Sequence, residues 1–531
     1  MFDLLFQGGT FVDGTGAPGR TADVGVAEGK IVAIGDLAAA EAAERLDIAG
    51  RVICPGFIDM HTHSDLPLLV NPSAQSKIRQ GVTTEVIGMC GFSPAPVSDA
   101  SVGQVRQLST FLAKGSAELD WSWRGYGDFL ARLAQQGVVV NVVPVVGHVT
   151  MRATAMGFGH RPPSVAELER MRWMVDEAMQ VGAFGYSSGL IYPPSSYAET
   201  DELVELAKAV ARHGGIYFTH IRGEGATLLR ATAEAIEIGE RAGLPVQIAH
   251  HKASGRPYHG RIAQALQLSE WANARGQRVR CDVYPYTAGS SSLSMIVPEW
   301  AHEGGRDQLL ARLANPETAG RIRADIAARG PVWEDIFVTW VASRENKELE
   351  GLSLAQIATR RGTDPTTALF QVLMEEKTQA AMVQFAVAED DARRVITHPL
   401  SVIGSDGSSL HPSGPLGEGK PHPRNYGTFP RVLQVYVREQ GALTLEQAIH
   451  KMTGASAGIL GLERKGVLRE GADADLVVFD PATVRERGTY ADPHQFPEGI
   501  DHVVVNGQLV VRRSEYTGAL AGSVLRRGRG A

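Results

Sequence analysis

The sequence predicts an α/β fold: a (β/α)8 TIM-like barrel, a small β-sandwich domain built from both termini, and an inserted lobe after strand 7. Three observations lead to this prediction. The middle of the chain alternates strand-length apolar runs with helical patterns, which is typical of a parallel sheet covered by helices. Both ends carry short β-branched runs broken by turn residues. The gap between Tyr284 and Ser401 is too long for a single crossover connection.

Eight apolar runs of strand length are expected to form the barrel, and helical patterns connect most of them. The runs are residues 52–60, 83–88, 138–147, 183–188, 216–220, 246–250, 279–284 and 401–405. The expected domains are residues 1–54 and 466–531 for the two parts of the sandwich, the second with a tail, and residues 55–465 for the barrel. The lobe is expected at about 287–344, followed by helices at 354–361 and 366–376.

Composition and charge exclude several classes of protein. The 531 residues include 52 Lys and Arg against 59 Asp and Glu, which gives a net charge of −7 and disfavours a nucleic-acid partner. Three cysteines cannot build a disulfide framework, which favours a reducing compartment. No apolar run approaches the roughly 20 residues of a spanning helix. We expect a cytoplasmic protein with a small-molecule substrate and no membrane partner, and the sequence leaves open a homo-oligomer.

Side chains that can bind a metal stand where the predicted strands end. They follow the first strand (two residues), then the second, fifth, sixth and eighth: His61, His63, Cys90, His220, His250 and Asp406. Because barrel enzymes keep their active sites at this end of the strands, we expect the six side chains to converge. Each residue alone also allows a structural role, and Ser405-Asp406-Gly407 is a good turn sequence. The coincidence of all six favours a metal centre.

The mixture of Cys, His and Asp predicts zinc, since magnesium and calcium prefer oxygen ligands. Zinc beside a carboxylate indicates hydrolysis. The metal lowers the pKa of bound water and polarises a carbonyl, while the carboxylate takes the proton. Asp406 is the natural general base.

These motifs resemble those of the amidohydrolase superfamily and, more closely, of the N-acyl-D-amino-acid deacylases (D-aminoacylases). The likeness runs almost end to end through residues 55–63 (PGFIDMHTH), 88–91 (GMCG), 219–222 (THIR), 250–252 (HHK), 284–286 (YPY), 404–407 (GSDG) and 421–424 (PHPR). Residues 471–476 are shared more widely among amidohydrolases. The resemblance implies zinc-dependent hydrolysis of N-acyl-D-amino acids to a carboxylate and a free D-amino acid.

The resemblance also implies how the metal is held. A tight zinc lies on the residues that match Cys90, His220 and His250. A second, weaker metal position is lined by those that match His61, His63 and Asp406. The cysteine takes the bridging place of the carboxylated lysine of hydantoinases and dihydroorotases, and its thiolate brings a negative charge without carbon dioxide. The other two cysteines, Cys54 and Cys281, are expected to be buried structural thiols in the first and seventh barrel strands.

The free carboxylate of such a substrate needs cations and hydroxyl donors, and the resemblance implies this role for Lys252, Arg424, Tyr192 and Tyr284. Lys252 follows a metal ligand by two residues and so points to the same face. Arg424 stands in a loop after Asp406, from which a guanidinium can fork onto a carboxylate. Arg222 and Glu224, just past another ligand, are expected to support the site.

The pocket for the amino-acid side chain is expected to be apolar. In family members that act on acidic substrates, an arginine after the seventh strand pairs with the distal carboxylate, whereas residues 290–300 here contain no cation. An acidic side chain would be desolvated without a partner, which is costly. A cation from another loop, or a simple core role for Leu293, Met295 and Trp300, is the alternative.

Two other functions remain open. One is a cyclic-amidase or dipeptidase-like amidohydrolase, and the other is a catalytically silent homologue that works as a scaffold. The complete set of candidate ligands disfavours a silent protein.

Overall fold

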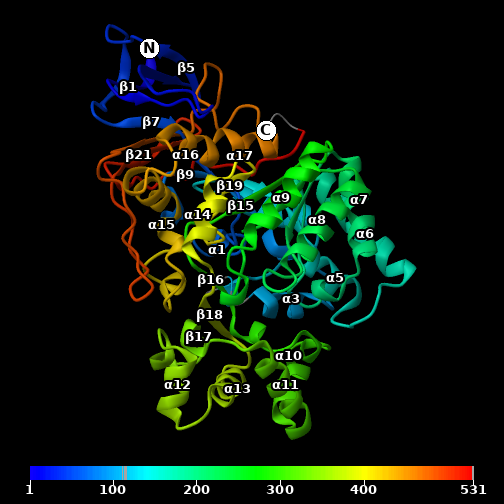
Figure 1. Ribbon diagram of the computed structural model, residues 1–531. Coiled ribbons are helices and arrows are strands. Elements are labelled where there is room, and N and C mark those ends of the chain that lie inside the picture. Colours follow the sequence, from blue (N-terminus) through cyan, green and yellow to red (C-terminus); the bar gives the residue numbers. More distant parts are fainter. Residues whose placement is uncertain (110–111, 113–115, 529–531) are drawn as a thin grey trace.

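The computed structural model describes residues 1–109, 112 and 116–528 of the chain. Figure 1 shows strands from both chain ends at one end of the molecule, parallel strands with helices around them in the middle, and a helical lobe at the opposite end. Within the described residues, no helix has both the length and the apolar character required to cross a membrane.

The parallel strands in the middle of the molecule pair in chain order. One sheet holds β8 (Phe57–Asp59), β9 (Val82–Ile87) and β10 (Asn141–Pro144), and another holds β11 (Val146–Gly147), β12 (Gly185–Gly189), β13 (Ile216–His220), β14 (Val246–Ile248), β15 (Val279–Val283) and β19 (Ser401–Ile403). The Phe184 amide donates to the Pro144 carbonyl over 2.8 Å and joins the two sheets. A parallel bridge between Thr62 and Gly407 brings the last strand back beside the first. The carboxyl ends of these strands therefore lie together.

Helices cover the outside of these strands. They include α4 (Tyr126–Gln136), α5 (His148–Met156), α6 (Val165–Gln180), α7 (Thr200–Arg212), α8 (Leu228–Ala242), α9 (Ile262–Ala274), α14 (Glu389–Thr397), α15 (Arg424–Arg431), α16 (Leu445–Met452) and α17 (Gly454–Leu460). Local sequence fixes their ends. Helix α6 starts at a capping box, in which the Ser164 amide donates to the Glu167 carboxylate over 2.7 Å and the Glu167 amide donates to the Ser164 hydroxyl. Helix α8 stops at Gly243, whose left-handed φ of 72° suits glycine.

The run expected as the first barrel strand, 52–60, is two strands in two different sheets. Strand β7 (Val52–Pro55) pairs with strands from the chain ends, and only β8 joins the parallel strands. Gly56 lies between them, where a Cβ atom would come within 2.1 Å of Thr83 Oγ1. A glycine lets the chain pass close to β9 as it changes sheets. The sequence suggests that Cys54 lies in the first barrel strand. The structure instead places it in β7, outside the sheets of the middle of the molecule.

Strands from the two chain ends share a sheet and a core. The seven-stranded sheet has the order β23 (Glu515–Tyr516), β22 (Gln508–Arg512), β21 (Ile500–Val505), β20 (Leu476–Phe479), β7, β2 (Thr10–Phe11) and β3 (Arg20–Thr21). A four-stranded sheet holds β5 (Lys30–Gly35), β4 (Asp23–Ala27), β1 (Phe2–Gln7) and β6 (Ala42–Asp47). Phe6, Val24 and Ile53 pack with Leu476 and Val504 in one apolar cluster. Burial of this cluster ties the two ends of the chain together.

A lobe lies between β15 and β19 in the sequence. Its sheet has the order β16 (Ala288–Ser292), β18 (Ala380–Phe385) and β17 (Ile336–Val341), and its helices include α10 (Arg306–Ala314), α11 (Pro316–Arg329), α12 (Leu354–Arg361) and α13 (Pro365–Glu375). Residues from Leu293 to Met382 form one apolar core. The packed unit therefore reaches β18, past the residue 344 expected from the sequence, because β18 pairs with both other strands.

Candidate metal centre

Four of the six candidate ligands form one group where the parallel strands end. His61, Cys90, His250 and Asp406 each offer one ligand atom, and these atoms lie within 4.8 Å of one another. Cys90 Sγ lies 3.3 Å from His61 Nε2 and 3.5 Å from His250 Nε2. All four side chains are buried. The group thus combines a thiol, two imidazoles and a carboxyl in a space that suits one small cation.

The other two candidates, His220 and His63, adjoin this group. Nδ1 of His220 lies 3.7 Å from Cys90 Sγ. Nε2 of His63 lies 3.0 Å from Asp406 Oδ1, and Nε2 of His61 lies 3.4 Å from the same oxygen. The structure therefore brings all six predicted side chains together.

Unusual backbone conformations aim three of these side chains inward. Cys90, His250 and Asp406 have positive φ values of 53°, 33° and 50°. Residues other than glycine rarely adopt such values, and they cluster at functional sites. Two residues before Cys90 stands Gly88, where a Cβ atom would lie 1.6 Å from the Val145 carbonyl oxygen. Only glycine lets the chain turn there and place the thiol at the strand end.

The surroundings of Cys90 favour the thiolate. Burial by itself favours the neutral thiol, but the charge of His61 and hydrogen bonds from His220 and His250 outweigh it and hold the pKa of Cys90 well below its ordinary value. A thiolate among imidazole nitrogens is a donor set that zinc prefers. The residues present therefore fit a zinc ion.

Comparison with known proteins identifies the family. Residues 44–511 match the sequence model described as the amidohydrolase family. The chain belongs to the amidohydrolase family. A D-aminoacylase from Alcaligenes xylosoxydans xylosoxydans is 40% identical over 526 residues, covering 99% of this chain and 98% of the relative.

Two solved structures are similar over nearly their whole length. A D-aminoacylase studied for its binuclear metal centre matches with a TM-score of 0.84 and 38% identity, covering 99% of this amidohydrolase and 100% of that chain. The N-acyl-D-glutamate deacylase from Bordetella bronchiseptica, complexed with zinc and a phosphonate inhibitor, matches with a TM-score of 0.84 and 35% identity, covering 99% of each chain.

Two carboxylates, the buried Asp282 and the partly buried Glu224, lie beside the histidines of this amidohydrolase and orient them. Asp282 Oδ1 lies 3.1 Å from His61 Nδ1 and accepts a 2.7 Å hydrogen bond from the His250 amide. Glu224 Oε1 lies 3.0 Å from His250 Nδ1 and 3.8 Å from His220 Nε2. Carboxylates in this position fix the tautomer and the orientation of metal-binding histidines. Sequence reasoning placed Glu224 near the site but missed Asp282, an acid inside an apolar strand.

Asp406 is shared between histidines and an arginine. Its Oδ2 lies 2.8 Å from Arg424 Nη1, while Oδ1 faces His61 and His63. Burial opposes ionisation of this carboxyl, but the charges of Arg424, His250 and His61 outweigh burial and hold its pKa well below the usual range. Asp406 is therefore a carboxylate that can accept a proton.

Tyr284 lies between the two cations that the sequence assigned to substrate. The Arg424 guanidinium carbon is 5.0 Å from the centre of its ring, and Lys252 Nζ is 5.5 Å from that centre. The buried Tyr284 hydroxyl and Arg424 Nε have no hydrogen-bond partner among the residues that the structure describes. Lys252 donates to Glu224 over 2.5 Å and stays beside the metal ligands. Unpaired donors at a cavity wall are suited to an anionic group of a ligand.

Tyr192 stands on the loop after β12. Its ring meets His220 edge to face with centroids 5.3 Å apart, and its hydroxyl lies 3.4 Å from Ser291 Oγ. Arg222 holds this loop, because it donates to the carbonyls of Ser196 and Ala198 over 2.8 Å each and pairs with Glu234. Arg222 thus supports the site through the Tyr192 loop and not through the metal ligands.

A cavity of about 420 Å³ opens over the metal centre and is lined on one side by the lobe. Its metal side includes His220, His250 and Asp406, and its lobe side includes apolar residues of the lobe and one arginine: Met295, Val297, Met382 and Arg329. A cation from outside residues 290–300, Arg329 at the end of α11, thus lies in this wall. No sequence signal pointed to it, because its position depends on how the lobe folds back.

The two remaining cysteines are buried away from the ligand group. Burial raises the pKa of Cys281 to about 12 and also raises that of Cys54. Both are therefore neutral thiols.

Proposed function

We propose that this amidohydrolase is a zinc-dependent deacylase that hydrolyses the amide bond of N-acyl-D-amino acids to a carboxylate and a free D-amino acid. The observation that carries the proposal is the meeting of Cys90 with His61, His220 and His250 beside Asp406, under a cavity whose wall includes the unpaired Tyr284 hydroxyl. The relatives named D-aminoacylase and N-acyl-D-glutamate deacylase support it over nearly the whole chain.

Cys90, His220 and His250 would hold the tight zinc, and His61, His63 and Asp406 would line a second, weaker position. Bound zinc would lower the pKa of a water molecule and polarise the amide carbonyl. The Cys90 thiolate would offset the charge of the metal, and Glu224 and Asp282 would keep the imidazoles in the binding orientation.

Asp406 would act as the general base. It would take a proton from the attacking water and return that proton to the leaving nitrogen, as one group can do in both halves of a hydrolysis. Its contact with Arg424 keeps it ionised before the reaction, and its neighbours His61 and His63 fix its direction.

The α-carboxylate of the substrate would bind between Lys252, Tyr284 and Arg424. The free Tyr284 hydroxyl and Arg424 Nε supply hydrogen bonds, and the two cations supply charge. The Tyr192 hydroxyl, in the wall of the same cavity, would donate to the amide carbonyl or the carboxylate. These contacts would hold the scissile amide over the metal centre.

The architecture that supports this function would be a (β/α)8 barrel, residues 55–465, with the inserted lobe at about 287–344 and beyond. Residues 1–54 and 466–531 would form one β-sandwich beside it. The parallel pairing of β8 with β9 and the bridge between Thr62 and Gly407 support a closed barrel. The shared cluster of Phe6 and Leu476 supports the sandwich.

The test is amine release from N-acetyl-D- and N-acetyl-L-amino acids by the purified protein of known zinc content. We expect release from the D series only, with N-acetyl-D-methionine ahead of N-acetyl-D-glutamate. Met295, Val297 and Met382 give the cavity an apolar wall, and each buried methylene contributes about 0.8 kcal/mol. Arg329 is exposed, so its charge is largely solvated. Release from the L series alone would contradict the proposed function, and preference for glutamate would assign Arg329 to the distal carboxylate.

A further inference from the structure

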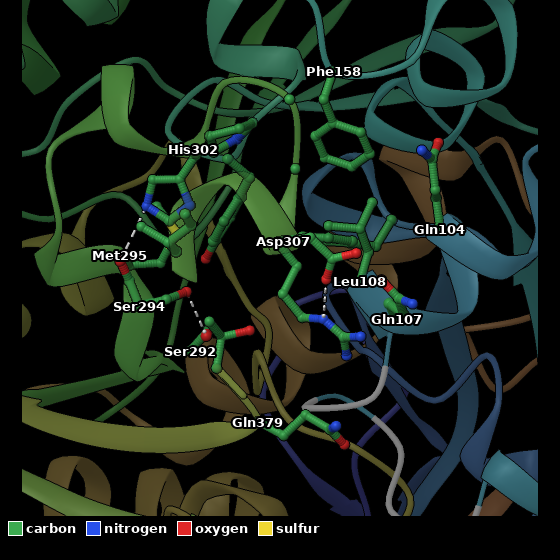
Figure 2. A pocket seen from close by; sticks show the side chains of 18 residues that line it. Gln104, Gln107, Leu108, Phe158, Ser292, Ser294, Met295, His302, Asp307 and Gln379 are labelled. Carbon is green, nitrogen blue, oxygen red and sulfur yellow. Dashed lines mark hydrogen bonds and ion pairs between the residues drawn. The ribbon is translucent and has the colours of Figure 1, made fainter. Parts of the chain in front are cut away.

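A second cavity adjoins the one over the metal centre (Figure 2). Its volume is about 240 Å³, and Tyr192, Pro193, Met295 and His302 line both cavities. This volume is below the roughly 300–1,000 Å³ of pockets that hold a whole small ligand. The side cavity is therefore suited to one end of a ligand whose reacting part lies over the metal centre.

An apolar wall leads from the metal centre into the side cavity. Phe92 follows Cys90 by two residues and packs with it in one apolar cluster, against which Leu108 and Tyr192 also pack. The Phe92 and Tyr192 rings meet edge to face with centroids 5.0 Å apart. Figure 2 shows Phe158 and Leu108 facing the same space, with Met295 on the other side. A hydrocarbon chain that starts at the metal centre would contact apolar side chains along this path.

The polar groups of the side cavity carry little net charge. Arg306 pairs with Asp307 over 3.5 Å, and Gln104, Gln107 and Gln379 are neutral amides at its edge. Burial lowers the pKa of His302 to about 4, so its ring is neutral at pH 7, and Nε2 of that ring lies 3.1 Å from the Ser294 carbonyl. Apart from Arg306, whose Nε has no hydrogen-bond partner among the described residues, the polar groups that this cavity offers to a ligand are therefore uncharged or exposed to solvent.

We propose that the side cavity receives the tail of the acyl group, so that the enzyme takes N-acyl groups longer than acetyl, such as hexanoyl and phenylacetyl. The assignment rests on the proposed function. Lys252, Tyr284 and Arg424, which would hold the α-carboxylate, are absent from the described lining of the side cavity. In the substrate amide, the acyl tail is bonded to the carbonyl carbon and the α-carbon is bonded to the nitrogen, so the two groups extend in opposite directions. With the carboxylate end at Tyr284, the tail points towards Phe92 and Leu108.

The experiment compares kcat/KM for N-hexanoyl-D-methionine and N-acetyl-D-methionine in three variants. Leu108→Trp fills the side cavity, and Phe158→Ala enlarges it. Val102→Trp is the matched control, because Val102 lies on the same helix, α3 (Val102–Ser109), but is not part of the cavity lining. One methylene in an apolar pocket changes specificity by about tenfold or more. We expect Leu108→Trp to lower the hexanoyl-to-acetyl ratio by about tenfold, Phe158→Ala to keep or raise it, and the control to leave it unchanged.

A second ratio tests the other possible occupant, the amino-acid side chain. If Leu108→Trp and Phe158→Ala changed the ratio of N-acetyl-D-phenylalanine to N-acetyl-D-alanine and left the hexanoyl-to-acetyl ratio unchanged, the acyl assignment would be wrong. An unchanged hexanoyl-to-acetyl ratio in both variants, with normal release from the acetyl substrate, would contradict the assignment alone. Absence of release from every N-acyl-D-amino acid by the unaltered enzyme would contradict the proposed function as well.

Discussion

Asp406 has a different partner on each of its two oxygens. Oδ1 lies 3.0 Å from His63 Nε2, and Oδ2 lies 2.8 Å from Arg424 Nη1. A group held in this way can accept a proton in one fixed direction, as a positioned general base requires.

The change Asp406→Asn keeps the shape of this side chain but removes its capacity to take a proton. We expect turnover to fall by about two to four powers of ten, the usual size of a general acid–base contribution, while the tight zinc stays bound. Steady-state rates and zinc content of the same preparation measure both effects. Asp390→Asn, at a side chain that is 83% exposed, is the control. A rate near that of the unaltered enzyme would rule out Asp406 as the base.

The position of Tyr284 beside two cations predicts that the substrate must carry a free α-carboxylate. If Lys252, Tyr284 and Arg424 hold the α-carboxylate, the free acid is required. Hydrogen bonds to charged groups contribute about 1.5–3 kcal/mol, so kcat/KM for N-acetyl-D-methionine amide should be about 10- to 100-fold below that of the acid. Kinetics on the acid, the amide and the methyl ester measure this. Equal values for the acid and the amide would remove these three residues from carboxylate binding.

At the scale of elements, a buried network fastens the strands from the chain ends to the parallel strands. Lys465 donates to Asp475 over 2.8 Å, and Asn141, the first residue of β10, donates to the same carboxylate over 3.0 Å. Asp475 also accepts a 2.7 Å hydrogen bond from the backbone N–H of Asn506, the residue after β21. Lys465 is 4% exposed and Asp475 is 3% exposed. The motif at 471–476, read from sequence as a general feature of amidohydrolases, thus supplies a structural joint.

Removal of Asp475 would leave the buried Lys465 ammonium with Asp473, 3.1 Å away, as its remaining carboxylate, and would leave the Asn141 side chain without its acceptor. Breaking a buried ion pair completely costs about 3–5 kcal/mol, so Asp475→Ala should lower the apparent free energy of unfolding by part of that amount. The matched control is Asp501→Ala, because Asp501 also forms an ion pair far along the chain, with Arg51, but both side chains are partly exposed, at 29% and 37%. Such a pair contributes about 0–1 kcal/mol. Urea unfolding measures both variants, and equal midpoints would show that the network does not join the two parts.

At the scale of the whole molecule, the candidate site depends on two kinds of position. The first kind lies at the ends of parallel strands, which meet by geometry, so His61, Cys90, His220 and Asp406 could be predicted from the sequence. The second kind depends on how distant segments pack. Arg329 reaches the cavity only because the lobe folds back over the metal centre.

The elements of the fold also divide into those that the local sequence predicts and those that depend on the packing of distant segments. Strand runs with clear ends, such as β13 and β15, were predicted within one residue, because buried parallel strands are apolar along their whole length. The split at Gly56 could not be predicted, since an apolar run does not show that its two halves pair with different sheets. Strand β18 was missed because it lies in a segment that the sequence pattern assigned to connections and helices. Asp282 was missed because its carboxylate is satisfied only by residues far away in the chain.

The lobe and the strands from the chain ends lie at opposite ends of the molecule (Figure 1). The cavity of the candidate site is lined both by residues at the ends of the parallel strands and by residues of the lobe. The lobe supplies Met295, Met382 and Arg329 to one wall of the site. Exchange of lobe residues should therefore change substrate preference, and the metal ligands on the strand ends should stay in place.

The central claim is that Cys90 anchors one zinc centre at the ends of the parallel strands, and the most direct test is zinc content after its removal. Zinc per chain should be measured by elemental analysis for the unaltered protein, Cys90→Ala, Cys54→Ala and Cys281→Ala, purified and dialysed together. All three cysteines are buried, but only Cys90 lies among histidines. We predict that Cys90→Ala alone loses its zinc and that the other two variants retain it. Full zinc occupancy in Cys90→Ala would contradict the account.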